Sequence, residues 1–207
     1  MHVVPAVATQ ISAEHARDAL RASMPGIDRE SAALLLALIW VETGSGVHCY
    51  NNNVGNITAS DAWSGGAWRP PWFEPSSDPH LNDLHTRMLA GQAPSAFRAY
   101  DSLTDGFADF VRTLKSTFPT VLTAAATGDP AAFVSALHDS RYSTDYNAAH
   151  IPTFRDLAAH FASLVASFPG GAGGVVAGGS AIVALGVLLI LASRRRRRHH
   201  RHRRHYA

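Results

Sequence analysis

The residue with the clearest chemical potential in this sequence is Glu42. It ends an apolar run that begins at Ser31 with helical spacing, and a Thr-Gly-Ser-Gly turn follows directly. At that spacing Glu42 shares a helix face with Leu35, Leu38 and Ile39, so its carboxyl is expected to point into a core or a cleft. Burial and the negative end of the helix dipole both raise the pKa of a carboxyl, which suits a general acid. The alternative is a helix-end glutamate capped by a nearby arginine.

An asparagine-rich stretch follows the candidate acid. Residues 50 to 59 read Tyr-Asn-Asn-Asn-Val-Gly-Asn-Ile-Thr-Ala. This density of Asn and Gly predicts a tight loop with left-handed positions and many amide donors and acceptors. Such a loop beside an isolated acid suits a sugar that carries N-acetyl groups. Asn52 and Asn53 are candidate substrate-binding residues, although asparagines in such loops commonly hold the turn, and Asn56 is expected to be mainly structural.

The order of these segments resembles a known family. A helix, Glu-Thr-Gly and then Asn-Asn-x-Gly-Asn-Ile is similar to the glucosaminidase superfamily of lysozyme-like peptidoglycan hydrolases, which includes the flagellar-type N-acetylglucosaminidases. Two later segments, Phe-Arg-Ala-Tyr-Asp-Ser at 97–102 and Arg-Tyr-Ser-Thr-Asp-Tyr at 141–146, are similar to further elements of that superfamily. The resemblance extends over residues 10–167, with four elements in the family order. It implies a lysozyme-like fold, with a cleft between a helical lobe and a β lobe, and cleavage of peptidoglycan glycan strands.

The resemblance also implies roles for individual residues. Glu42 matches the catalytic glutamate at the helix end, and Tyr142 matches a tyrosine that holds substrate near it, unless Tyr142 is a core residue between helices. Glu74 lies near the place of a second catalytic acid in the β lobe, and Asp61 is the other acid there. Three prolines stand near Glu74 where the family has strand-forming residues, so Glu74 could simply be solvated. A substrate N-acetyl group acting as internal nucleophile would make a second carboxylate unnecessary.

The aromatic side chains between residues 54 and 77 are candidates for sugar binding. Trp63, Trp68 and Trp72 could stack on sugar faces, or they could pack a lobe that is too small to have its own core. The twelve histidines show no metal-ligand spacing and no phosphate-binding loop follows a strand, so neither a metal nor a cofactor is expected. The single cysteine, Cys49, excludes an intramolecular disulfide.

Local signals predict a mainly helical α+β domain with one small, irregular β lobe. The stretch from 54 to 77 lacks helical period, and residues 95–100 are a candidate strand. A last helix should carry apolar positions from residue 151 to 165. The predicted helix-capping residues, each before a helical pattern, are Ser12, Asp28, Asp78, Ser102 and Asp129.

The C-terminal part has a different character. Residues 170–192 carry no charge, and as a helix they would extend about 35 Å, enough to span a bilayer. Eight of the 18 basic residues are arginines within 194–207, so the rest of the chain has ten basic and 16 acidic residues, a net charge of −6. We therefore expect a lysozyme-like domain at 1–167, a Pro/Gly hinge at 168–174, a transmembrane helix at 175–192 and an Arg/His-rich tail at 193–207.

These features predict a membrane-anchored hydrolase. The domain would cleave the GlcNAc-β-1,4-MurNAc bond on the peptidoglycan side of the membrane, with the tail on the cytoplasmic or virion-interior side. The bilayer would hold residues 170–192, and the tail would contact anionic lipid or nucleic acid. The N-terminus does not have the pattern of a secretion signal, which makes a phage protein a serious alternative to a bacterial one. The alternatives in activity are a muramidase, a lytic transglycosylase, or a non-catalytic wall-binding or virion structural module.

Overall fold

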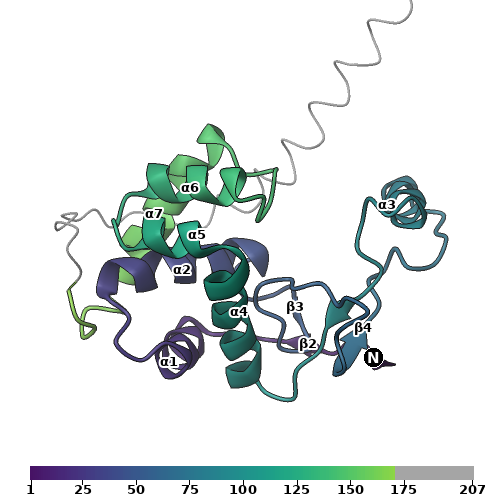
Figure 1. Ribbon diagram of the computed structural model, residues 1–207, viewed down its shortest axis with the longest axis horizontal. Coiled ribbons are helices and arrows are strands. Elements are labelled where there is room, and N and C mark those ends of the chain that lie inside the picture. The colour runs from purple at the N-terminus through teal and green to yellow at the C-terminus, as the bar shows by residue number, and fades with distance from the viewer. Residues whose placement is uncertain (171–207) are drawn as a thin grey trace, which may run out of the picture.

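The computed structural model describes residues 1–170, which form a helical part and a smaller β part (Figure 1). The helical part contains α1 (Ala13–Ser23), α2 (Arg29–Glu42), α4 (Leu103–Thr117), α5 (Pro119–Ala125), α6 (Pro130–Asp139), a short 3-10 turn η1 (Ala148–His150) and α7 (Ile151–Ala162). The β part lies beside α4, and α3 (Pro79–Leu89) lies beyond it. The mainly helical α+β architecture expected from the sequence is therefore confirmed for these residues.

Side-chain caps define the helix starts. Ser12 accepts a hydrogen bond from the amide of His15, and Asp28 accepts one from the amide of Ser31. All five predicted capping residues take this role, because each offers an oxygen to amides that the first turn leaves unpaired. The helices therefore begin where local chemistry predicts.

The core surrounds α2. Every residue from Ser31 to Ile39 is buried, so this helix is covered on all sides and not only on the face that includes Glu42. It packs against α7, which supplies the fully buried Phe161, and α4 adds the fully buried Phe107 and Phe110 to the same core. Each such side chain contributes about 1.5–3 kcal/mol by leaving water. The result is a rigid support with Glu42 at its last residue.

The β part consists of two very small sheets. In the first, β4 (Gly66–Trp68) pairs in parallel with β1 (His2–Val3) and antiparallel with β5 (Phe97–Arg98). In the second, β2 (Ala8–Thr9) pairs antiparallel with β3 (Cys49–Tyr50). The N-terminal segment thus contributes a strand to each sheet, which the sequence did not predict.

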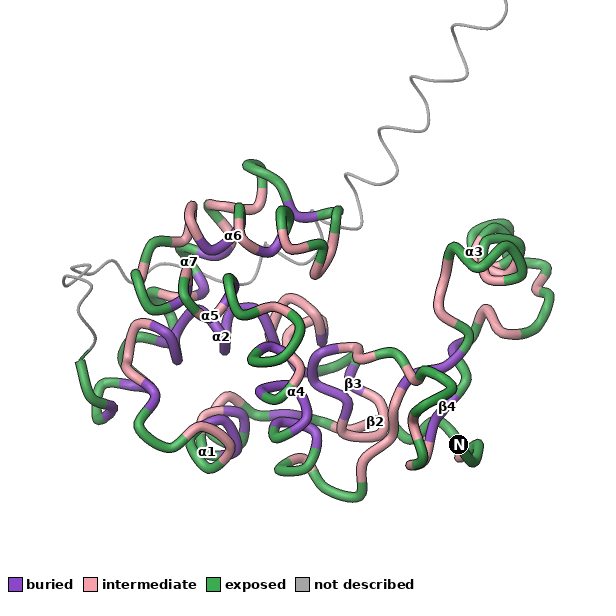
Figure 2. The backbone as a smooth tube through the Cα atoms, in the orientation of Figure 1, coloured by how far each residue is buried: buried purple, intermediate pink, exposed green. Residues whose placement is uncertain are grey.

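Helix α3 has no buried residue, and Figure 2 shows it only in the colours of exposed and intermediate residues. Trp72 connects α3 to the β part. Its carbonyl lies 3.1 Å from Nδ1 of His85 in α3, its indole N–H donates to the carbonyl of Pro94, and its ring packs edge-on against Phe97 of β5.

The described chain ends beside the start of α2. Phe168 is buried, and the amide of Arg29 donates to the carbonyl of Pro169 at 2.7 Å. The first residues of the expected hinge are thus packed against the domain. Within residues 1–170 no helix is long and apolar enough to cross a membrane. The expected transmembrane helix at 175–192 and the tail at 193–207 lie outside the described residues.

Candidate active site

Glu42 lies half-buried at the C-terminal end of α2. The next residue, Thr43, is fully buried; its hydroxyl donates to the carbonyl of Ile39 and accepts from the amide of Gly46. Gly44 and Gly46 take positive φ angles of 55° and 80° in the turn that follows. This tight turn ends the helix abruptly and leaves the Glu42 side chain at the edge of the core.

Two donors hold the carboxyl of Glu42. The Tyr146 hydroxyl donates to Oε1 at 2.7 Å, and the Asn56 side-chain amide donates to Oε2 at 3.1 Å. The same amide group donates to the backbone carbonyl of Glu42 at 3.0 Å. The two donors fix the direction of the carboxyl.

The two tyrosines of the 141–146 segment make different contacts. Tyr146 is buried against His150 and Phe154 and reaches Glu42 directly. The predicted residue, Tyr142, instead donates to the carbonyl of Gly55 at 3.3 Å. Burial, and secondly the negative charge of Glu42, raises the pKa of both hydroxyls well above the ordinary value. Tyr146 therefore remains a hydrogen-bond donor to Glu42 through the neutral and moderately alkaline range.

The asparagines that follow Glu42 divide into structural and site residues. Asn53 is 1% exposed; its amide group donates to the carbonyls of Ile57 and Arg98, and its oxygen accepts from the Ile57 amide. The expectation that Asn53 binds substrate is therefore wrong, because its polar atoms are buried within the fold. The Asn52 side chain also forms hydrogen bonds within the fold. Its amide group donates to the Tyr100 carbonyl, and its oxygen accepts from the Thr9 hydroxyl.

Asn56 shows the reverse outcome. We expected it to be mainly structural, yet its side-chain amide donates to both the carboxyl and the backbone carbonyl of Glu42. Asn56 has a positive φ of 48°, a conformation in which asparagine is enriched over other side chains. The signal that could have identified it is this combination of a left-handed position and a side chain able to turn back to the helix end.

Helix α4 supports this loop from behind. An added Cβ on Gly106 would overlap the backbone oxygen of Asn52, and one on Gly55 would overlap the ring of Phe110. Glycine at both positions lets helix and loop approach more closely than any side chain would permit. The loop beside Glu42 therefore rests on a rigid element of the core.

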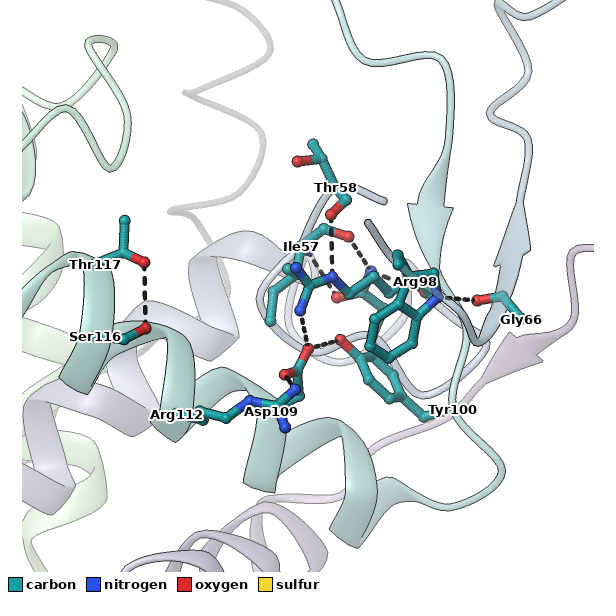
Figure 3. A network of polar contacts seen from close by, with 11 residues as sticks. Ile57, Thr58, Gly66, Arg98, Tyr100, Asp109, Arg112, Ser116 and Thr117 are labelled. Atoms are coloured by element: carbon teal, nitrogen blue, oxygen red, sulfur yellow. Dashed lines mark hydrogen bonds and ion pairs between the residues drawn. The ribbon is translucent and has the colours of Figure 1, made fainter. Parts of the chain in front are cut away.

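A buried ion-pair network joins α4 to β5. Figure 3 shows the carboxylate of Asp109 in contact with Arg98, Tyr100 and Arg112. Burial alone would raise the pKa of Asp109, but the hydrogen bonds from Tyr100 and Arg98 and the two arginine charges outweigh it and lower that pKa. The 97–102 segment identified in the sequence thus connects β5 to α4, and Arg98 and Tyr100 of its motif make this connection.

The three tryptophans proposed as sugar platforms differ in exposure. Trp68 is 5% exposed and packs between Phe97 and Tyr50, with ring centroids 5.1 Å apart in both pairs. A sugar cannot stack on a ring in that position, so the expectation for Trp68 is wrong. Trp63 and Trp72 are half-buried, and each donates its indole N–H to a backbone carbonyl. Their role in substrate binding stays a prediction.

Glu74 is exposed in a bend between β4 and α3, and Asp61 is exposed in the turn before β4. The catalytic role of Glu74 stays a prediction. No group of three potential metal ligands occurs in the described part of the chain. Residues 50–59 are called the asparagine segment below. A surface hollow is lined by Thr58 and Ala59 from the end of this segment and by residues 91–96, and Glu42 is not among its lining residues.

Comparison with known proteins gives similarity at the level of solved structures. No protein-family model matches the chain, and no curated protein matches it. A peptidoglycan hydrolase from Sphingomonas sp. A1 is 20% identical, with 80% of this chain and 94% of that chain covered and a TM-score of 0.48. A mutant of that hydrolase is 22% identical, with 73% and 92% covered and a TM-score of 0.47. This likeness concerns the fold, and the function is argued below from the site.

Proposed function

We propose that this chain is a peptidoglycan hydrolase that cleaves the glycan strand with Glu42 as its catalytic acid. The observation that carries the proposal is the carboxyl of Glu42, half-buried at the end of a rigid helix and held by Tyr146 and Asn56. A general acid must be held in one direction to meet the glycosidic oxygen, and two donors on one carboxyl supply that constraint. The sequence elements shared in order with the glucosaminidase superfamily support the choice of substrate.

The proposed reaction begins with proton transfer. The Glu42 carboxyl gives its proton to the oxygen of the glycosidic bond as the bond between that oxygen and the anomeric carbon breaks. The anomeric carbon then needs a nucleophile. Because Glu74 is exposed in the bend between β4 and α3, we assign this step to the N-acetyl group of the substrate, whose carbonyl oxygen attacks the anomeric carbon before water completes hydrolysis. The bond proposed is GlcNAc-β-1,4-MurNAc.

A site in which Glu42 is the single catalytic carboxyl also suits a second activity. In a lytic transglycosylase a hydroxyl of the substrate replaces water as the final nucleophile, and a single acid that returns as a base is sufficient. The two reactions leave different ends, because hydrolysis at the proposed bond gives a GlcNAc reducing end, whereas transglycosylation gives an anhydro-MurNAc end. Product analysis therefore separates them.

We propose further that residues after 170 anchor the domain in a membrane, with the Arg/His tail on the cytoplasmic or virion-interior side and the domain on the peptidoglycan side. The uncharged stretch 170–192 and the arginines that follow support this. The described chain ends beside Arg29, at the start of α2, whereas Glu42 is at the other end of this helix, about 20 Å away. An anchor there would leave the acid free to reach the wall.

The orientation is tested by protease digestion. Protease added outside sealed vesicles or virions should digest the domain and spare the tail; the reverse pattern would contradict this orientation.

The experiment on the catalytic proposal compares two isosteric changes on one helix. Glu42→Gln should reduce hydrolysis of dye-labelled peptidoglycan by about two orders of magnitude or more, because an essential acid is lost. Glu30→Gln makes the same chemical change at the opposite end of α2, where Glu30 pairs with Arg29, and should leave the rate within about twofold because it lies a helix length away from Glu42. Activity of Glu42→Gln within a few-fold of wild type would favour a non-catalytic wall-binding module.

A further inference from the structure

Arg98 contacts the asparagine segment at three points and helix α4 at a fourth. Its backbone amide donates to the carbonyl of Ile57 at 2.9 Å, and its backbone carbonyl accepts from the Asn53 side chain at 3.0 Å. Its guanidinium donates from Nε to the carbonyl of Thr58 at 3.2 Å and from Nη1 to Asp109 at 2.7 Å. The side chain of one residue therefore joins the end of this segment to helix α4, as Figure 3 shows.

The other end of this connection is firmly fixed. Asp109 is 4% exposed, lies on α4 and also accepts from Tyr100. Because its pKa is lowered, it stays ionised, so the charge on Arg98 always has its partner. A buried carboxylate that loses its partner is strongly unfavourable, which keeps the guanidinium in place.

What this connection fixes is Asn56. Ile57 and Thr58, two of the residues that Arg98 contacts, follow Asn56 directly. Asn56 sits in the left-handed region at φ 48°, which persists only where the surroundings determine the conformation. Its amide group reaches both the backbone oxygen and the carboxyl of Glu42. A small shift at Thr58 would therefore move the donor away from the acid.

We propose that Arg98 is a positioning residue for the reaction: its guanidinium ties Thr58 to Asp109 and so keeps the amide of Asn56 on Glu42. This rests on the proposed function, since it assigns to Arg98 an effect on the catalytic acid. Arg98 acts through Asn56 and does not itself touch Glu42. A residue that only stabilised the fold would lower the melting temperature without a specific effect on turnover.

The test uses Arg98→Lys and Arg112→Lys as a matched pair in the full-length protein. A lysine keeps a positive charge near Asp109 but lacks the planar fork that reaches two acceptors at once. Arg98→Lys should lower kcat by about tenfold or more with KM little changed, since misplacement of a catalytic group reduces turnover. Arg112 contacts the same Asp109 from a side chain that is 66% exposed, and within residues 1–170 it forms no hydrogen bond to the asparagine segment. Arg112→Lys should therefore leave kcat within about twofold.

A double-mutant cycle with Asn56→Ala decides whether Arg98 acts through Asn56. If it does, Arg98→Lys added to Asn56→Ala should change kcat by less than about twofold, because the donor that Arg98 positions has gone. Multiplication of the two single effects, or wild-type kcat in folded Arg98→Lys, would overturn the proposal. Asp109→Asn, which weakens the same tie from the other side, replaces Arg98→Lys in the cycle if circular dichroism shows that the lysine variant does not fold.

The cycle includes Glu42→Gln as a reference. An active Glu42→Gln variant would overturn the proposed function itself. An inactive Glu42→Gln variant together with independent effects of Arg98 and Asn56 would overturn only the role of Arg98.

Discussion

The two parts of this molecule are ordered by different forces. In the helical part, nine consecutive residues of α2 are buried and the surrounding helices add phenylalanine side chains, so apolar packing fixes the structure. In the β part, the strands are two or three residues long and side chains on backbone groups supply much of the order, as Asn53 and Arg98 show. Glu42 belongs to the first part and its partner Asn56 to the second. The site thus depends on apolar packing for the acid and on polar contacts for its positioning.

The largest effect on stability should come from the helical part. Leu36 is fully buried, and Leu36→Ala should lower the free energy of unfolding by about 2–5 kcal/mol through lost burial and a residual cavity. In the β part, Trp72→Phe removes the hydrogen bond to the Pro94 carbonyl and should cost only about 0.5–1.5 kcal/mol. Urea unfolding followed by circular dichroism measures both, and equal losses would contradict the division drawn here.

The contact between the two parts is tested at Gly106. In an ordinary helix, replacing glycine by alanine stabilises by about 1 kcal/mol. Here the new methyl group would overlap the Asn52 backbone, so Gly106→Ala should destabilise by about 1–3 kcal/mol. Ala108→Gly, at an exposed position of the same helix, is the control and should show the ordinary propensity cost. A raised melting temperature for Gly106→Ala would mean that loop and helix are not in close contact.

Tyr146→Phe removes one donor from Glu42 and keeps the buried ring. Glu42 becomes charged as it gives up its proton, and a hydrogen bond to a charged group contributes about 1.5–3 kcal/mol, so kcat/KM should fall about tenfold or more. Tyr142→Phe, which loses only a bond to the Gly55 carbonyl, should have a smaller effect. Because the pKa of Tyr146 is raised, its proton and this hydrogen bond are present at and below the ordinary tyrosine pKa. They are lost only as pH rises through the higher folded value, so the contrast between the two variants should persist into the moderately alkaline range. Equal effects of the two changes would make the Tyr146 contact incidental.

The smallest effect is expected at Glu74. Its side chain is exposed in the bend between β4 and α3, so Glu74→Gln should leave the hydrolysis rate within about twofold of wild type. A loss as deep as that of Glu42→Gln would instead make Glu74 the second catalytic carboxylate and would remove the need for the substrate N-acetyl group as nucleophile.

Local signals in the sequence predicted more of the fold than of the site. Helix starts depend on a side chain and amides two or three residues away, so the capping residues could be identified without tertiary information. Glu42 was also recognisable, because an apolar helical run ends in an acid. The contact between Tyr146 and Glu42 joins residues 104 positions apart, and no local pattern distinguishes Tyr146 from Tyr142. Strands β1 and β2 were missed because two-residue strands exist only through partners distant in the sequence.

The central claim, that this chain hydrolyses peptidoglycan with Glu42, is tested most directly by mass spectrometry of the products. Purified sacculi would be digested with the full-length wild-type protein in detergent and, in parallel, with Glu42→Gln. We predict fragments with new GlcNAc reducing ends from the wild type and none from the variant. Fragments released equally by both proteins, or no new reducing ends from the wild type, would contradict it.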